Sequence, residues 1–532
     1  MHKFKILTLS LLTGVAISCC DKQEPKTREN TVPPNAVEKK VTIDAATFYQ
    51  TITGFGASDC WQPAWIGKYW TKSRERISEL LFSGAIEGKN PKGIGLSMWR
   101  VNLGAGSAEQ GDASGIETIT RRAENYLSTN GQYDWNKCEG QRYFMRRAKE
   151  LGVDNFILFS NSPLVQYTYN GQGRSDRGGV SNLKSEHYSD YAGYMADVAG
   201  HFINEGYNVT HISPVNEPQY NWDGHDQEGS GWTNEEVATL VRELDSSLTS
   251  RNLSTDILMG ESGDWEYLYK IKGDRARSNV IEDFFNPESS AYVGNLPHVK
   301  KLISGHSYWT DGAWDSMRSV RKSVAQKAQQ YELEVWQTEW SMIGDGYSSS
   351  EYVGNNNAST LDIALYMSKV IHNDLTVAGA TSWCFWTSMD VAHWGHQNRF
   401  LLISLTPSGG EWGDVMLGDG AFAATPTLWV LGNFSLFIRP GYKRIKLELN
   451  ESRSFFGSGY ISPDNKQIVT VYSNLSDKPV QLTETHVGWD DVASVKTYTT
   501  SATKELLEAD VTHGNPVVLD AKSVTTVVYH LK

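Results

Sequence analysis

Cysteine is scarce in this chain: five occur among 532 residues, and two of them are adjacent near the N-terminus. The others, Cys60, Cys138 and Cys384, cannot form a disulfide framework, and no Cys-x-x-Cys pair is present. No cluster of His and Cys has the spacing of metal ligands, so the sequence predicts neither a metal nor another cofactor. We expect these three cysteines to be small buried residues.

Excess basic charge and long apolar runs are lacking as well. Lys and Arg number 49 against 62 Asp and Glu, and the formal net charge of −13 argues against a nucleic-acid partner and against binding to an anionic membrane surface. No stretch reaches about 18 uninterrupted apolar residues, so no transmembrane helix is predicted. Hydrophobic residues make up 39% of the chain, enough for a large core, and the 18 Trp, 25 Tyr and 17 Phe suit both a core and the faces of sugars.

Residues 1–18 have the organisation of a secretory signal peptide. A basic start with Lys3 and Lys5 precedes a mostly apolar run that is shorter than the roughly 20 residues a membrane-spanning helix needs. The run ends in Ala-Ile-Ser before Cys19, which resembles a bacterial lipobox, where the cysteine receives lipid and becomes the new N-terminus. Cys20 is a second candidate for lipidation, and simple secretion is the alternative.

Residues 19–40 are polar and charged and contain Pro33 and Pro34, so we expect a flexible tether. With lipid on Cys19, the tether would hold a catalytic domain away from the membrane. The sequence therefore predicts an exported bacterial lipoprotein, at the cell surface or in the periplasm, that contacts the membrane only through its lipid anchor.

Short apolar runs alternate with helical stretches over residues 50–438. In Tyr191–Ile203 the apolar positions follow helical spacing, and Thr233 with Glu236 forms a capping box before another amphipathic stretch. Eight runs are strand-like: Ile52–Phe55, Ile94–Val101, Asn155–Ser160, Val209–Val215, Asp256–Met259, Lys301–Ser304, Leu333–Thr338 and Ala380–Trp386. Eight strands alternating with helices predict an α/β fold with parallel strands, for which a closed (β/α)8 TIM barrel is the natural form.

Residues 439–532 have a different texture, with short alternating strands separated by turn residues such as Asp464 and Asn465. The strand-like runs are Arg444–Leu449, Phe455–Ile461, Gln467–Tyr472, Val480–Thr485, Val495–Thr499 and Val524–Leu531. This pattern predicts an appended C-terminal β-sandwich. Residues 41–49, before the barrel, also look like a strand.

Two glutamates stand at the ends of predicted barrel strands, where a βα barrel carries its catalytic groups. Glu217 follows the fourth strand in Ser-Pro-Val-Asn-Glu-Pro, and Glu339 ends the seventh in Val-Trp-Gln-Thr-Glu-Trp. Facing carboxylates suit glycoside hydrolysis, because one protonates the leaving oxygen while the other attacks the anomeric carbon; a separation of about 5–5.5 Å gives retention and about 6.5–9.5 Å inversion. The alternative is a pair of surface or salt-bridged glutamates.

These two motifs resemble the large clan of retaining (β/α)8 glycoside hydrolases. Three further segments narrow the resemblance: Gly54–Ser58 (Gly-Phe-Gly-Ala-Ser), Ser97–Asn102 (Ser-Met-Trp-Arg-Val-Asn) and Phe434–Gly441 (Phe-Ser-Leu-Phe-Ile-Arg-Pro-Gly). In combination they are similar to glycoside hydrolase family 30, the family of glucosylceramidase, endo-β-1,6-galactanases, β-1,6-glucanases and certain xylanases. The resemblance runs from about residue 41 to the C-terminus.

The resemblance implies roles for four residues at the strand ends. Glu217 would be the acid/base and Glu339 the nucleophile, while Asn216 would hydrogen-bond the sugar 2-hydroxyl. Arg100 would orient Glu339 and keep it ionised, since a nearby guanidinium lowers the pKa of a carboxylate. The family's sandwich takes a strand from the N-terminus, which accounts for the strand-like residues before the barrel.

Aromatic side chains surround these positions. We expect Tyr308 or His306, at the end of the sixth strand, to hydrogen-bond Glu339 and fix its rotamer, although a buried histidine is often only a core residue. Trp386 ends the eighth strand and is a candidate platform under the −1 sugar. Tyr167 follows the third strand, where many relatives carry Trp-Met, and would substitute for that pair.

The loop after the fourth strand carries Gln-Glu-Gly-x-x-Trp at residues 227–232, which looks like the endo-β-1,6-galactanase branch. Trp222 and Trp232 would stack on sugars, and Glu228 would accept hydrogen bonds from sugar hydroxyls. The alternative is that the loop only covers the barrel. Glu261, at the end of the fifth strand, is expected either to bind substrate or to be structural.

The sequence therefore predicts a monomeric, retaining endo-glycosidase that hydrolyses β-1,6-galactan, such as arabinogalactan side chains. A β-1,6-glucanase or a xylanase of the same family is the alternative, because discrimination at the sugar 4-hydroxyl rests on one or two hydrogen bonds. An alternative of another class is a catalytically silent polysaccharide-binding lipoprotein, against which the presence of both glutamates argues.

Overall fold

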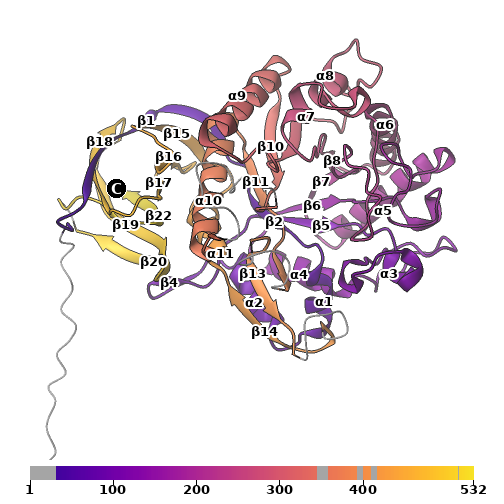
Figure 1. Cartoon of the computed structure of the whole chain (residues 1–532), viewed down its shortest axis with the longest axis horizontal. Coiled ribbons are helices and arrows are strands. Elements are labelled where there is room, and N and C mark those ends of the chain that lie inside the picture. Colours follow the sequence, from indigo (N-terminus) through magenta and orange to yellow (C-terminus); the bar gives the residue numbers. More distant parts are fainter. Residues whose placement is uncertain (1–31, 344–356, 392–398, 409–415, 490, 513) are drawn as a thin grey trace, which may run out of the picture.

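The computed structural model describes residues 32–343, 357–391, 399–408, 416–489, 491–512 and 514–532. Two regions lie side by side (Figure 1): an α/β region that contains most of the chain, and a β-rich region made from both ends of the described chain. The predicted signal peptide, Cys19 and Cys20 lie outside the described residues.

The α/β region is built on a curled sheet of eight parallel strands. In order across the sheet they are β8 (Asp256–Ile257), β7 (Val209–Ser213), β6 (Asn155–Phe159), β5 (Met98–Asn102), β2 (Gly54–Ser58), β11 (Ser382–Phe385), β10 (Glu334–Glu339) and β9 (Leu302–His306). Each of the eight predicted strands has its counterpart here, with ends that differ by a few residues. The predicted parallel α/β architecture is confirmed, and its strands read as continuous apolar runs because both faces of the sheet are buried.

The outer strands in this order, β8 and β9, are joined by contacts between β9 and the residues that follow β8. The amide of Ser304 donates to the carbonyl of Met259 at 2.8 Å, and the amide of His306 donates to the carbonyl of Ser262 at 2.8 Å. Ser262 and Gly305 also form a parallel bridge. The curl of the sheet therefore brings the carboxyl ends of its first and last strands together.

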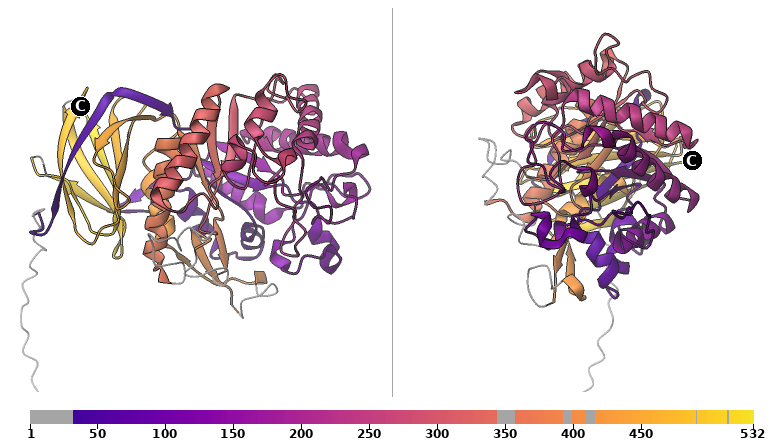
Figure 2. Two further views of the ribbon diagram at one scale, coloured as in Figure 1. Left: turned by 45° about the horizontal axis from the view of Figure 1, so that its top comes forward. Right: turned by 90° about the vertical axis from the view of Figure 1, so that its right-hand side faces the viewer.

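Helices cover the outer face of the sheet (Figure 2). They are α1 (Gln62–Tyr69), α2 (Arg74–Phe82), α3 (Ser107–Gln110), α4 (Glu139–Glu150), α5 (Tyr188–Asn204), α6 (Asn234–Ser250), α7 (Glu266–Tyr269), α8 (Val280–Phe285), α9 (Trp314–Gln330), α10 (Thr360–Asn373) and α11 (Pro426–Ser435). The predicted capping box is confirmed at the start of α6: the Thr233 hydroxyl accepts from the Glu236 amide, and the Glu236 carboxylate accepts from the Thr233 amide. The periodic stretch Tyr191–Ile203 lies within α5.

The β-rich region is a sheet of nine strands. In order they are β20 (Lys504–Val511), β19 (Val492–Ser501), β22 (Ser523–Leu531), β17 (Gln467–Asn474), β16 (Phe455–Ile461), β15 (Lys443–Leu449), β1 (Val37–Thr51), β18 (Val480–Val487) and β21 (Val518–Leu519). β1 pairs with β15 antiparallel and with β18 parallel. The N-terminal strand thus joins the C-terminal sheet, and it begins at Val37, inside the segment predicted to be tether.

The sequence patterns missed several short strands. β20 and β21 were not foreseen, nor were the pair β3 (Ile86–Glu87) and β4 (Asn90–Pro91). A small sheet of β12 (Met389–Val391), β13 (Ile403–Thr406) and β14 (Ala421–Ala424) follows the last strand of the α/β region. Apart from β20, which has eight residues, these strands have two to four residues and are too short for an alternating pattern to identify them.

One hydrophobic cluster extends across the two regions, and the β-rich region has a second cluster of its own. Helices α10 and α11 lie between them, and apolar residues of β17, β19 and β22 belong to the same buried cluster as those of the α/β region. The side-chain amide Nδ2 of Asn433 on α11 donates to the backbone carbonyl of Tyr498 at 2.9 Å, and the backbone carbonyl of Asn433 accepts from the hydroxyl of Thr526 at 2.6 Å. The β-rich region is therefore a support for the helices behind β11.

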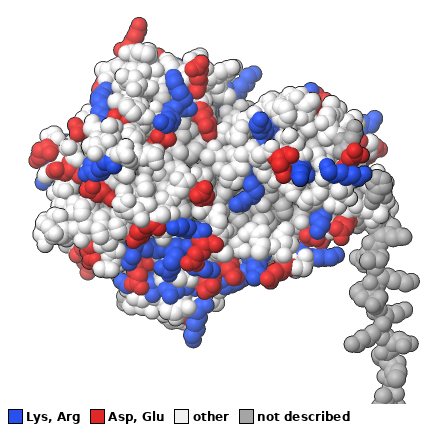
Figure 3. All heavy atoms as spheres, turned by 180° about the vertical axis from the view of Figure 1, so that it is seen from behind, with Lys and Arg blue, Asp and Glu red and all other residues white. Residues whose placement is uncertain are grey.

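The surface mixes charges of both signs. On the face shown in Figure 3, Lys and Arg side chains are interspersed with Asp and Glu. Within the part of the chain that the structure describes, no helix has both the length and the apolar character needed to cross a bilayer.

Candidate active site

The carboxyl ends of five strands bring five ionisable side chains together. Arg100 lies on β5, Glu217 follows β7, Glu261 follows β8, His306 ends β9 and Glu339 ends β10. All five residues are buried, and the most exposed, Glu217, is 9% accessible. We call these five residues the charged cluster. Because parallel strands end at the same edge of the sheet, residues far apart in the sequence meet here.

The glutamates after β7 and β8 adopt a backbone conformation that L-residues seldom use. φ is +41° at Glu217 and +49° at Glu261, in the left-handed region. The Glu217 amide donates to the carbonyl of Glu261 at 2.9 Å, and its carbonyl accepts from the amide of Tyr220 at 3.0 Å and the indole of Trp222 at 3.2 Å. Such over-determined backbone strain is typical of functional sites.

Short contacts join the side chains around Glu217 and Glu339. His306 Nδ1 lies 2.8 Å from Oε1 of Glu217 and 3.8 Å from Oε1 of Glu339. Arg100 Nη1 lies 3.1 Å from Oε2 of Glu339, whose Oε1 accepts from the Tyr308 hydroxyl at 3.0 Å. One oxygen of each glutamate and one ring nitrogen of His306 all lie within 4.8 Å of one another. The two carboxyls therefore face each other at close range.

Glu261 is the counter-ion of two cations. Its Oε2 lies 2.7 Å from Arg100 Nη2 and 3.4 Å from His306 Nε2, and its Oε1 accepts from the Ser304 hydroxyl at 2.8 Å. Burial alone would raise the pKa of Glu261, but the charges of Arg100 and His306 lower it to about 2. Glu261 is therefore an anion throughout the neutral pH range.

His306 is a cation over the same range. Burial disfavours its charge, but the Glu339 carboxylate and the hydrogen bonds with Glu217 and Glu261 raise the pKa of His306 to about 10. A protonated imidazole has no lone pair to offer a metal ion. Although Glu217, His306 and Glu339 are close enough to share a cation, the arrangement favours proton chemistry.

The carboxyl of Glu339 is harder to ionise than an ordinary glutamate. Burial raises the pKa of Glu339 above its ordinary value, and His306 and Arg100 oppose this shift without cancelling it. The predicted lowering by Arg100 is thus present but outweighed by desolvation. The charged cluster combines two cationic side chains, Arg100 and His306, with the carboxyls of Glu217, Glu261 and Glu339.

Two predicted substrate-binding residues lie beside the charged cluster. Asn216 is buried, and its Oδ1 has no hydrogen-bond partner among the described residues, which leaves it available to a ligand. Trp386, which follows β11, packs edge-on against Trp61 with ring centroids 5.1 Å apart and against Phe159 at 6.4 Å. The guanidinium of Arg100 lies 4.3 Å from the centre of the Phe159 ring. One aromatic ring therefore separates Trp386 from the cluster.

Two residues predicted to touch substrate have other partners, which corrects those predictions. Trp232 is 1% exposed and packs edge-on against Tyr188, so it has no face free for a sugar. The carboxylate of Glu228 accepts from the amides of Ala105 and Ser107 at 2.9 and 3.1 Å and from the Ser107 hydroxyl at 2.6 Å. Burial raises the pKa of Glu228 to about 7 against these bonds. Glu228 anchors the loop after β5.

Trp222 and Tyr167 are only partly buried. The Trp222 ring lies over Gly229, where an added Cβ would be 2.4 Å from the ring, and its indole is bonded to the backbone of Glu217. Trp222 is thus fixed beside the charged cluster. The Tyr167 ring stacks on His187 with centroids 4.7 Å apart, so one of its faces already has a partner.

Sequence reasoning missed two features of this site. The role of Glu261 as counter-ion to Arg100 and His306 was not foreseen, although its position directly after the fifth strand was the available signal. Trp309, which follows Tyr308, is 58% exposed and has a φ of +53°. The place of Trp309 beside Tyr308 at a strand end was the available signal for its position, but not for its exposure.

A parallel α/β sheet whose strand ends carry two facing carboxyls has what the hydrolysis of an acetal requires. The sequence profile of O-glycosyl hydrolase family 30 matches residues 38–397. The chain belongs to this family and is a glycoside hydrolase, which confirms the resemblance seen in the motifs. The alternative of a non-catalytic binding protein is thereby set aside.

Similar proteins differ in what they hydrolyse. An endo-β-1,6-galactanase from Hypocrea rufa is 25% identical over 378 residues, 67% of this chain and 68% of that protein. Glucuronoxylanase XynC from Bacillus subtilis is 24% identical over 434 residues, 81% of this chain and 76% of that protein. The solved structure of a conserved exported protein from Bacteroides fragilis matches with a TM-score of 0.85 at 31% identity, covering 92% of this chain and 100% of that chain.

Proposed function

We propose that this glycoside hydrolase retains anomeric configuration, with Glu217 as acid/base and Glu339 as nucleophile. The observation that carries the proposal is the approach of the two carboxyls, whose nearest oxygens lie within 4.8 Å. Retaining enzymes hold their carboxyls about 5–5.5 Å apart, whereas inverting enzymes need about 6.5–9.5 Å to admit a water molecule.

The hydrogen bonds support this division of roles. Both oxygens of Glu339 accept, from Tyr308 and from Arg100, and two donors stabilise the ionised form and fix its direction. Glu217 receives the His306 bond at Oε1, so its Oε2 is the oxygen suited to carry the proton toward a leaving group. Asn216, with a buried amide oxygen that lacks a partner, is suited to the sugar 2-hydroxyl.

In the first step an oxygen of Glu339 bonds to the anomeric carbon while the glycosidic C–O bond breaks and Glu217 gives its proton to the leaving oxygen. In the second step Glu217, now ionised, takes a proton from water, whose oxygen displaces Glu339 from the same carbon. Arg100 and His306 stay positively charged throughout. They therefore stabilise whichever carboxyl carries the negative charge.

For the substrate we propose β-1,6-linked galactan, cleaved within the chain by a monomeric enzyme. The Gln-Glu-Gly-x-x-Trp loop and the resemblance to an endo-β-1,6-galactanase support this choice. Xylan is the second candidate, since a glucuronoxylanase matches a larger share of this chain. β-1,6-Glucan is a third, since a single hydroxyl configuration distinguishes it from the galactan.

Incubation of the purified protein with β-1,6-galactan, β-1,6-glucan and glucuronoxylan, followed by product sizing, tests the substrate. Short oligomers from galactan alone are expected. Oligomers from xylan or glucan alone would overturn the substrate but leave the mechanism. NMR of the first-formed anomer tests retention, and an inverted product would overturn the proposed roles.

We further propose that residues 1–18 are a signal peptide, that Cys19 is lipidated, that residues 50–438 form a closed (β/α)8 barrel, and that residues 439–532 form a β-sandwich with the N-terminal strand. The backbone contacts between β8 and β9 support closure. Metabolic labelling with a fatty-acid analogue is expected to mark the wild type and Cys20→Ser but not Cys19→Ser. Label retained in Cys19→Ser would exclude that site.

A further inference from the structure

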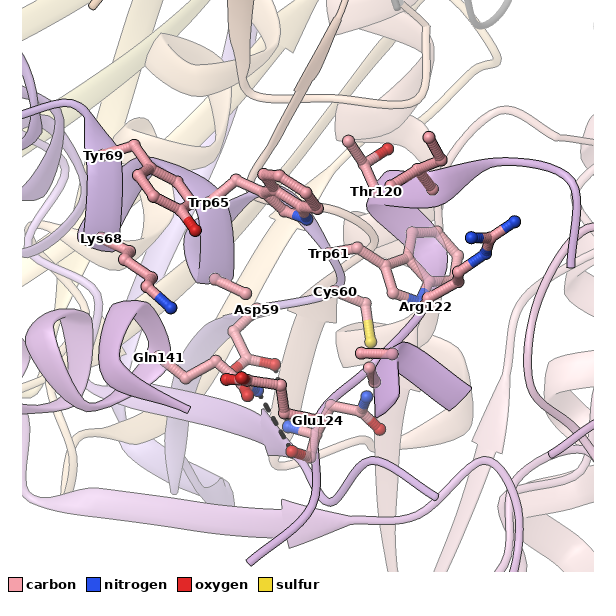
Figure 4. A pocket seen from close by; sticks show the side chains of 15 residues that line it. Asp59, Cys60, Trp61, Trp65, Lys68, Tyr69, Thr120, Arg122, Glu124 and Gln141 are labelled. Carbon is pink, nitrogen blue, oxygen red and sulfur yellow. Dashed lines mark hydrogen bonds between the residues drawn. The ribbon is translucent and has the colours of Figure 1, made fainter. Parts of the chain in front are cut away.

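A cavity of about 210 Å³ lies outside the charged cluster, and Figure 4 shows the side chains that line it. It is bounded by the ends of β2 and β5, by α1 and α4, and by parts of the segment 119–124. No member of the charged cluster lines it. The proposed mechanism gives this cavity no role.

The lining combines flat aromatic rings with hydrogen-bonding groups. Trp65 and Tyr69 lie one turn apart on α1, with ring centroids separated by 5.8 Å, and both are half-buried. The ammonium of Lys68 and the carboxylate of Glu124 also reach the cavity (Figure 4). Among the described residues no hydrogen bond or ion pair engages the Lys68 ammonium, so it can donate to a ligand. Aromatic faces for C–H groups, flanked by donors and acceptors for hydroxyls, suit a sugar ring.

The size of the cavity limits what it holds. Pockets for drug-sized ligands have volumes of about 300–1,000 Å³, and this one is smaller. It therefore suits one sugar unit and not an extended stretch of polysaccharide.

The cavity and the catalytic centre share a wall. Cys60 and Trp61 line the cavity, and Trp61 meets Trp386 edge-on, with centroids 5.1 Å apart. At its inner end Asp59 accepts from the Asn102 amide at 2.8 Å, while the Asp59 amide donates to the carbonyl of Arg100 at 3.0 Å. The thickness of one residue layer thus separates the two sites. A sugar unit in the cavity would therefore lie close to a glycan held at the charged cluster.

We propose that this cavity binds one sugar unit of the polysaccharide that the charged cluster cleaves, either a unit farther along the chain or a side branch. The inference rests on the proposed function. The sugar face stacks on Trp65, and Lys68 and Glu124 bond its hydroxyls. The cavity thereby selects among substrates without changing the chemistry.

The test measures glycan binding separately from turnover. Galacto-oligosaccharides of two to six β-1,6-linked units, with and without an arabinose branch, are titrated calorimetrically into Glu339→Gln protein. Adding Trp65→Ala is expected to weaken binding of either the longest linear or the branched oligosaccharide about tenfold. Weaker binding of the linear one means that the cavity holds a unit farther along the chain, and weaker binding of the branched one means that it holds a side branch. Lys68→Ala is expected to weaken the same arm about threefold. Phe48→Ala, an exposed ring on β1, is the matched control and should change neither arm.

In the otherwise wild-type enzyme, Trp65→Ala is expected to leave kcat/KM on a short aryl glycoside within about twofold of its original value. Unchanged binding of every oligosaccharide by Trp65→Ala and Lys68→Ala would overturn the cavity proposal, while wild-type hydrolysis of the polysaccharide leaves the proposed function standing. Absence of wild-type hydrolysis on all polysaccharides would overturn the proposed function, and the titrations would still decide the cavity. If Trp65→Ala does not fold, the partly exposed Lys68 carries the test.

Discussion

Two sets of buried charges in the described part of the chain differ in how their acids and bases meet. In the charged cluster three carboxyls face Arg100 and His306. Elsewhere in the α/β region Arg321 of α9 forms an ion pair with Asp374 at 2.8 Å, and both side chains are fully buried. The second Asp374 oxygen accepts from the Ser307 hydroxyl at 2.8 Å and the Trp383 indole at 2.9 Å.

Desolvation acts on both groups, so burial alone does not distinguish them. Burial raises the pKa of Asp374, and Arg321 opposes the rise, just as Arg100 does at Glu339. The difference lies in the contacts: Arg321 forms one ion pair, with Asp374, whereas Arg100 and His306 together contact three carboxyls. A buried pair of this kind serves the fold, and we propose that the facing carboxyls of the charged cluster serve the chemistry.

The largest effect on activity, without a loss of stability, is expected from Glu339→Gln. Loss of the nucleophile should lower kcat by a factor on the order of 10⁴ or more. The melting temperature should hold or rise, because a neutral amide removes the repulsion between Glu339 and Glu217. Rates on an aryl glycoside, with a thermal melt, check both. Exposed Glu332→Gln is the control, and a variant retaining a hundredth of the activity would contradict the assigned role.

The two facing carboxyls should differ from each other in a way that depends on the leaving group. Glu217→Gln should lower kcat on polysaccharide about 10³-fold, because the leaving sugar needs a proton. An aryl leaving group of low pKa needs none, so formation of the glycosyl-enzyme should be far less affected. Pre-steady-state bursts with a series of aryl glycosides measure this. Equal losses across the series would speak against Glu217 as the acid.

We expect loss of the Arg321–Asp374 ion pair to lower stability and to leave activity nearly unchanged. Asp374→Asn leaves Arg321 buried without its counter-ion, which should cost about 3–5 kcal/mol of unfolding free energy. Turnover per folded molecule should stay within about twofold, since neither residue touches the charged cluster. Denaturant unfolding and active-site titration separate the two effects. A selective loss of kcat with unchanged stability would reverse the interpretation of this pair.

Glu261→Gln should shift the pH dependence of the unfolding free energy. The pKa of His306 in the folded protein is about 10, above the ordinary value of about 6.5. The stability that His306 contributes is therefore fully present below pH of about 6.5 and lost as pH rises through about 10. Removing the Glu261 charge lowers the pKa of His306 in the folded protein, so the loss should be smaller and complete at lower pH, with kcat reduced about 10- to 100-fold. Unfolding free energies between pH 6 and 10 test this; an unshifted profile would contradict it.

Features with a local sequence signal could be predicted, and features that depend on tertiary contacts could not. Glu217 and Glu339 each end an apolar run and lie within a short recognisable motif, so both the parallel sheet and the two facing acids were predictable from the sequence. The contact of Arg100 with Glu261 joins residues 161 positions apart, and no local sequence motif indicates it. Whether a tryptophan in a loop faces solvent or core is also a tertiary property, which is why the interpretation of Trp232 needed correction.

The smallest expected effect comes from a glycine that contacts the acid/base. A Cβ at Gly263 would lie 3.3 Å from Cδ of Glu217, close enough that the carboxyl must shift by a few tenths of an ångström. Because a displacement of about 1 Å can cost 10²-fold in rate, Gly263→Ala should lower kcat/KM about tenfold or less. Gly312→Ala, where an added Cβ meets nothing within 4 Å, is the matched control. The drop should be smaller on aryl glycosides that need no proton; an equal drop on all substrates would place the disturbance at Glu339 instead.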